Sequence, residues 1–174
     1  MKIAVLSDTH DHIWNLEKAV KKISGKVEAF IHCGDLCSPF IPEILKKIKA
    51  PGHVCLGNND EDQIAMKNVG GDTISWVTVG QQFGEVTLDK RKIAYCHYPK
   101  LGSLLAATGD YDAVFYGHTH EAVNKAIGKT LLLNPGAVCG ISAGVIFGEK
   151  KEHNPASYAI YDTKTNSAEI TKLK

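Results

Sequence analysis

The chain has 174 residues, of which 44% are hydrophobic and 22% charged, a composition typical of one globular domain with its own core. Its 20 basic and 19 acidic residues give a formal net charge of +1, which argues against a nucleic-acid-binding or membrane-bound surface. The five cysteines lack the spacing of a zinc motif or of a disulfide framework. We therefore expect a single domain over residues 1–174, with no stable nucleic-acid binding and no membrane attachment.

The first half of the sequence alternates strand and helix patterns. The predicted elements are, in chain order, the strand Ile3–Ser7, a helix with Ile13, Leu16, Val20 and Ile23 on one face, the strand Ala29–Cys33, a helix capped by Ser38 and opened by Pro39, and the strand Val54–Gly57. This order predicts a mainly parallel sheet. The first apolar run is also too short for a signal-peptide core or a membrane span, so we expect a cytoplasmic protein.

The second half is dominated by short strands. They are predicted at Thr73–Val79, Gly84–Leu88, Lys92–His97, Ala113–Tyr116, Ala122–Ile127 and Thr130–Leu133, with one helix at Lys100–Thr108 and a closing hairpin of Ser157–Asp162 and Ala168–Leu173. The glycine-rich stretch Gly140–Pro155 is predicted to be a surface loop. The fold class that fits is α+β (α/β), a two-sheet β-sandwich flanked by helices.

Side chains that bind metals follow five of the predicted strands. They are Asp8 and His10, then Asp35, then Asn58 with Asn59 and Asp60, then His97, and last His118 and His120. The carboxyl ends of parallel strands are where ligands converge. Within each pair two residues apart, an extended backbone would point both side chains the same way. Glycines before several of these residues would let the chain turn sharply.

Each of these residues has an ordinary interpretation when it is taken alone. An aspartate after a strand usually caps a helix or forms a turn, and we assign the capping role to Asp11. His12, His32, His53 and His153 belong to none of the clusters and are interpreted as ordinary surface or core residues. Histidine is not a typical turn residue, however, so turns do not account for the whole set. Oxygen ligands mixed with imidazoles suit Mn²⁺, Fe²⁺, Ni²⁺ or Zn²⁺.

The motifs together resemble the calcineurin-like metallophosphoesterase superfamily. They are Asp8-x-His10, Gly34-Asp35, Gly57-Asn58-x-Asp60, His97 and Gly117-His118-x-His120. The stretch Leu133-Asn134-Pro135-Gly136 and the small size resemble its compact prokaryotic phosphodiesterase branch, of the type seen in archaea. The resemblance runs in order over nearly the whole chain.

This resemblance implies two divalent ions, with Mn²⁺ or Ni²⁺ preferred and Fe²⁺ or Zn²⁺ as alternatives. One ion would be bound by Asp8, His10 and His120, the second by Asn58, His97 and His118, with Asp35 bridging them. A hydroxide shared by ions about 3.5–4 Å apart would attack a small phosphodiester in line. Asn59 and Asp60 are the catalytic candidates, and Asp60 is expected to orient an imidazole, that of His10.

Departures from the family pattern shape the expected substrate. Asn59 stands where many members have a histidine, and an amide donates a hydrogen bond but delivers no proton near neutral pH. This favours slow turnover and leaving groups that depart unprotonated. The compact branch often lacks this histidine and is associated with phosphodiester hydrolysis, so the resemblance implies a diester substrate. Tyr98 adds bulk at the mouth of the site. The alternatives are a phosphomonoesterase and a non-catalytic interaction scaffold like the retromer subunit of the same fold, and a homodimer is also left open.

Overall fold

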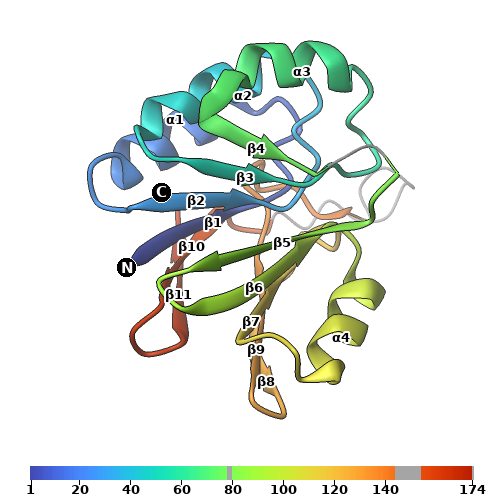
Figure 1. Cartoon of the computed structure of the whole chain (residues 1–174). Helices are drawn as coiled ribbons and strands as arrows, with labels where there is room; N and C mark the ends of the chain where they lie inside the picture. Colours follow the sequence, from blue (N-terminus) through green and yellow to red (C-terminus); the bar gives the residue numbers. More distant parts are fainter. Residues whose placement is uncertain (78–79, 144–153, 174) are drawn as a thin grey trace.

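The first sheet is built around the parallel strands that the sequence predicts. The computed structural model describes residues 1–77, 80–143 and 154–173 (Figure 1). The strands are β1 (Lys2–Leu6), β2 (Ala29–His32), β3 (Gly52–Val54), β4 (Ile74–Trp76), β10 (Ser157–Asp162) and β11 (Ser167–Lys172), in the order β11-β10-β1-β2-β3-β4. Strands β1 to β4 run parallel, and the closing hairpin β10–β11 adds antiparallel to β1.

The second sheet contains the short strands of the second half. They are β5 (Phe83–Leu88), β6 (Arg91–Cys96), β7 (Ala113–Phe115), β8 (Ala122–Ile127) and β9 (Thr130–Pro135), in the order β5-β6-β7-β9-β8. Strands β6, β7 and β9 are parallel, while β5 and β8 pair antiparallel at the two edges. Parallel strands thus occupy the middle of both sheets.

Alternation along β1 shows how the layers pack. Ile3 and Val5 belong to the core between the sheets, whereas Ala4 and Leu6 pack under the helices. Helices α1 (Ile13–Ile23), α2 (Phe40–Leu45, continued by a 3-10 turn at Lys46–Ile48) and α3 (Gln63–Gly70, followed by a 3-10 turn at Gly71–Thr73) cover the outer face of the first sheet. Helix α4 (Pro99–Thr108) covers the second sheet (Figure 1). The predicted two-sheet sandwich flanked by helices is confirmed.

Several local predictions are wrong. Helix α3 was not predicted, because of its eight residues only Met66 and Gly70 are buried and its apolar stripe is therefore weak. Strand β3 ends at Val54, three residues before Gly57. Helix α1 is capped by His12, whose Nδ1 accepts a hydrogen bond from the Asn15 backbone N–H, and not by Asp11.

The cap of α2 also differs from the prediction. No side chain caps this helix, since the Ser38 hydroxyl donates to the carboxylate of Asp11 instead. Most of the predicted loop Gly140–Pro155, including His153, lies outside the described residues. Within the described part of the chain, no helix has both the length and the apolar character needed to cross a membrane.

Candidate metal centre

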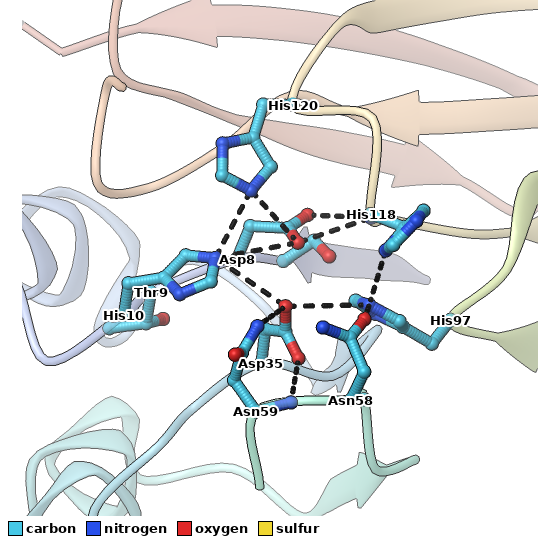
Figure 2. A network of polar contacts seen from close by, with 12 residues as sticks. Asp8, Thr9, His10, Asp35, Asn58, Asn59, His97, His118 and His120 are labelled. Atoms are coloured by element: carbon cyan, nitrogen blue, oxygen red, sulfur yellow. Dashed lines mark hydrogen bonds and ion pairs between the residues drawn. The ribbon is translucent and has the colours of Figure 1, made fainter. Parts of the chain in front are cut away.

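All the predicted ligand residues come together at one edge of the sandwich. Asp8 and His10 follow β1, Asp35 follows β2, and Asn58 to Asp60 follow β3. His97 follows β6, and His118 and His120 follow β7. The carboxyl ends of parallel strands lie at the same edge of a sheet, and here the two sheets contribute together (Figure 2).

The first group of ligand atoms joins three residues from opposite sheets. The Nε2 atoms of His10 and His120 lie 3.1 Å apart. Asp8 Oδ1 lies 3.4 Å from Nε2 of His120 and 4.0 Å from Nε2 of His10. Asp8 is fully buried, and its carboxylate also accepts the backbone N–H of His118.

The second group lies beside the first and is more open. His97 Nε2 lies 3.0 Å from Asn58 Oδ1 and 3.2 Å from His118 Nδ1. His97 is buried, whereas Asn58 and Asn59 are exposed, so the site opens to solvent on this side. The Tyr98 ring packs edge-on against His97 and His118 at this opening and is 40% exposed.

The carboxylate of Asp35 lies between the two groups. Its Oδ2 is 3.5 Å from Nε2 of His10 and 3.5 Å from Nε2 of His97 (Figure 2). Asn59 holds this carboxylate from the other side, since its backbone N–H and its side-chain amide donate at 2.9 and 2.8 Å. One oxygen of Asp35 therefore lies equally close to an imidazole of each group.

Backbone carbonyls set the orientation of two imidazoles. The Nδ1 of His97 is 2.8 Å from the carbonyl oxygen of Cys33, and the Nδ1 of His120 contacts that of Ile141. A carbonyl oxygen only accepts, so each Nδ1 carries the hydrogen and each Nε2 faces the site. Such outer contacts fix the tautomer of histidine ligands in metal sites.

The four histidines of the site form two pairs, and in each pair the pKa of one ring is raised while that of the other is lowered. Burial opposes the charged form of His120, but Asp8, the Cys139 thiol and the Ile141 carbonyl raise its pKa to about 10. Burial lowers the pKa of His10. In the other pair, burial also opposes the charged form of His97, but Asp35 raises its pKa, whereas burial lowers the pKa of His118. Each pair thus has one ring whose charged form is favoured, next to one whose neutral form is favoured.

Asp35 stays ionised in this environment. Burial alone would raise the pKa of its carboxyl group, but His97 and Asn59 outweigh burial and hold this pKa well below its usual range. A buried carboxylate that is held ionised, with four imidazoles around it, is a donor set suited to divalent first-row cations. The residues present therefore fit the metal ions that the family resemblance implies.

The backbone at the site is not extended, contrary to the prediction for the two-apart pairs. Seven residues other than glycine have a positive φ here, namely Asp8, His10, Asp11, Asp35, Cys37, His118 and His120. Each such conformation costs roughly 1 kcal/mol for a residue other than glycine. The convergence of the ligands therefore depends on strained turns held by tertiary contacts, and strain of this kind clusters at functional sites.

Two of the glycines serve close approach and not a sharp turn. A Cβ on Gly117 would lie 1.9 Å from Ser7 Oγ and 2.8 Å from Asp8 Oδ2. A Cβ on Gly57 would lie 2.2 Å from Asp35 Oδ1. Of Gly34, Gly57 and Gly117, only Gly34 has a positive φ, +92°, which is the conformation that the predicted sharp turn requires.

Asp60 does not contact the imidazole of His10, so that prediction is wrong. Its Oδ1 accepts the backbone N–H groups of Leu36 and Cys37 at 2.7 and 2.8 Å. Its Oδ2 accepts those of Asp35 and Gly57 at 2.9 and 2.7 Å. Asp60 therefore joins the turn that carries Asp35 to the turn that carries Asn58.

Two further residues that the sequence did not single out support the site. His32 is fully buried behind it, and its Nε2 lies 2.9 Å from the hydroxyl of Thr9, the residue between two ligands. Cys139 brings its sulfur next to His10 and His120. His32 lies inside an apolar strand and Cys139 lies in the turn after β9, so only long-range contacts reveal either role.

Comparison with known proteins identifies the family. The family described as the calcineurin-like phosphoesterase superfamily domain matches residues 1–166. The phosphodiesterase MJ0936 of Methanocaldococcus jannaschii is 35% identical over 161 residues, which cover 88% of this chain and 96% of that protein. A solved structure of an archaeal phosphodiesterase has a TM-score of 0.83 at 31% identity and covers 99% of this chain and 100% of its own.

A more distant structure shares the fold alone. The Zn²⁺ complex of Vps29 from Entamoeba histolytica has a TM-score of 0.68 at 17% identity, with 99% of this chain and 98% of that chain covered. Given the match over most of its length, the chain belongs to the calcineurin-like phosphoesterase superfamily. It is a metal-binding hydrolase that acts on phosphoester bonds, and the predicted resemblance is confirmed.

Proposed function

We propose that this protein is a dinuclear-metal phosphodiesterase. Asp8, His10 and His120 would hold one divalent ion, and Asn58, His97 and His118 the second. The observation that carries this proposal is the position of Asp35, whose Oδ2 is equally distant from Nε2 of His10 and of His97, at 3.5 Å. A carboxylate so placed would be within reach of both ions. Mn²⁺ or Ni²⁺ is the expected pair, with Fe²⁺ or Zn²⁺ as alternatives.

Two such ions, when bound, supply Lewis acidity toward the phosphoryl oxygens and an activated water for in-line attack. The residues of the chain hold the ions and attract the phosphate group of the substrate. Asp8 and Asp35 contribute two negative charges against the four positive charges of two divalent ions, so the site attracts a phosphate although the whole protein is nearly neutral. Asn59 acts by holding Asp35 through two hydrogen bonds, and its amide brings no proton to a leaving group.

One feature of the site favours a diester over a monoester. The pocket beside the second ligand group is lined by Leu56, Gly57, Gln63, Val77, Gly80, Gln81, Gln82 and Tyr98. These described lining residues include no lysine or arginine to neutralise the second charge of a monoester. Tyr98 narrows the opening, so we propose a small substrate. The archaeal relatives named phosphodiesterases support the same reaction.

The decisive experiment compares hydrolysis of bis-p-nitrophenyl phosphate with that of the p-nitrophenyl monoester. The protein is stripped of metal and titrated with Mn²⁺, Ni²⁺ or Zn²⁺, with Asp35→Asn in parallel. We expect metal-dependent diester cleavage that exceeds monoester cleavage. Loss of the bridging carboxylate should lower the rate on the order of 100-fold or more.

Other outcomes would select the alternatives. Faster cleavage of the monoester would make the protein a phosphomonoesterase. Stoichiometric metal binding without cleavage of either ester would favour the interaction scaffold. We also propose a cytoplasmic location, and the homodimer stays a prediction that light scattering of the purified protein would test.

A further inference from the structure

A cysteine lies against the first ligand group. One ligand atom from each of His10, His120 and Cys139 lies within 4.8 Å of the others. We propose that the Cys139 thiolate is a further ligand to the metal ion that His10 and His120 hold. This inference rests on the metal centre proposed above, and it adds a sulfur donor to a set of oxygen and nitrogen donors.

The backbone at Cys139 is held in place by hydrogen bonds to other parts of the chain. Its N–H donates to the carbonyl of Asp8 at 3.1 Å, and the N–H of Val138 donates to that of Ser7 at 3.0 Å. The Asn15 amide donates to the carbonyls of Val138 and Cys139 at 3.2 and 3.3 Å. The cysteine is 3% exposed. The backbone of Cys139 is therefore fixed to the backbone that carries Asp8, and its side chain is shielded from bulk water.

The spacing of the two imidazoles suits the binding of both rings to one ion. Two nitrogens each about 2.0–2.1 Å from one tetrahedral ion lie roughly 3.3 Å apart. The observed separation of the two Nε2 atoms is 3.1 Å. One nitrogen of each ring also lies within 4.8 Å of the Cys139 sulfur, so a movement of the cysteine side chain would bring the sulfur to the ion.

A thiolate changes which ion this position prefers. Sulfur is a soft donor that selects Zn²⁺ or Co²⁺ over Mn²⁺, whereas the other position has the donors Asn58, His97, His118 and Asp35. The two positions should therefore differ in metal preference. On binding, the thiol proton is released to solvent, because a coordinating thiol is deprotonated. Metal uptake should thus release one proton more in the native protein than in Cys139→Ser.

The test uses Co²⁺ as a spectroscopic probe of the full chain. Two equivalents are added to the metal-stripped protein, and we expect a sulfur-to-cobalt charge-transfer band in the near ultraviolet. Cys139→Ser should lose this band while it still binds Co²⁺. The matched control is Cys37→Ser, because the Cys37 sulfur lies 3.6 Å from Nδ1 of His10, the ring nitrogen that faces away from the ligand group. This control should keep the band.

X-ray absorption of the Zn²⁺-loaded native protein gives a measurement that needs no variant. We expect a Zn–S distance of about 2.3 Å, and a loss of Zn²⁺ affinity in Cys139→Ser of on the order of tenfold or more. Bound Co²⁺ without the band, or Zn²⁺ without a Zn–S distance, overturns the role of Cys139 and leaves the metal centre standing. Failure to bind Co²⁺ at all overturns the metal centre itself.

Discussion

Replacing Asp60 by asparagine tests whether this carboxylate holds the two turns of the site together. Each of its oxygens accepts two backbone N–H groups, at distances of 2.7 to 2.9 Å. In either orientation, an asparagine amide turns its NH₂ toward two of these donors, so at least two hydrogen bonds are lost. Hydrogen bonds to a charged group contribute about 1.5–3 kcal/mol each, so we expect a loss of roughly 3–6 kcal/mol in the free energy of unfolding.

Urea denaturation followed by circular dichroism in EDTA measures this loss without a contribution from bound metal. With a slope of about 2 kcal/mol per molar urea, the midpoint should fall by about 1.5–3 M. The matched control is Asp62→Asn. Asp62 is exposed and caps α3 through the Ala65 N–H at 3.1 Å, and asparagine caps equally well. A change below about 1 kcal/mol in Asp60→Asn would refute the anchoring role.

Three more outcomes are expected. Asn59→Ala leaves Asp35 only a backbone donor, so metal affinity measured by calorimetry should fall about 10–100-fold, and unchanged affinity would contradict the positioning role. Gly117→Ala places a Cβ in close contact with Ser7 and Asp8, so it should weaken metal binding about tenfold or more. In the control Gly128→Ala the new Cβ meets open space, so this variant should leave metal binding unchanged and lose only roughly 1 kcal/mol of stability through its positive φ. Burial lowers the pKa of His32 to about 4, so as the pH falls below 6.5 the unfolded chain takes up the proton first and stability is lost progressively toward pH 4. In unfolding curves from pH 7 to 4, the metal-free native protein should lose up to about 3 kcal/mol more than His32→Gln, and parallel pH profiles would refute this assignment.

Much of the fold was predictable because it depends on local pattern. The apolar alternation in β1 and the helical stripe of α1 are periodic signals that a single sequence displays directly. Helix α3 was missed because only Met66 and Gly70 of its residues are buried while Ile64 is exposed, so its burial leaves no apolar stripe in the sequence. The early end of β3 depends on hydrogen bonds to its neighbours in the sheet, which the sequence does not display.

The identity of the candidate ligands was determined by the sequence itself. Aspartate, asparagine and histidine are residue types that bind metals, and here they follow successive strands. Because the carboxyl ends of parallel strands meet at one edge of a sheet, the sequence alone predicts that these side chains form one site. The family match over residues 1–166 confirms the family that these motifs indicated.

Only the tertiary structure decided how those ligands are held. The positive φ of Asp8 and His10 costs energy locally, so no local preference predicts it, and contacts from distant strands must impose it. The four N–H groups on Asp60 come from two turns at Asp35–Cys37 and Gly57, and Cys139 reaches the site across 129 residues from His10. Such contacts are set by the packing of whole layers, which is why the donors could be found in the sequence but their supports could not.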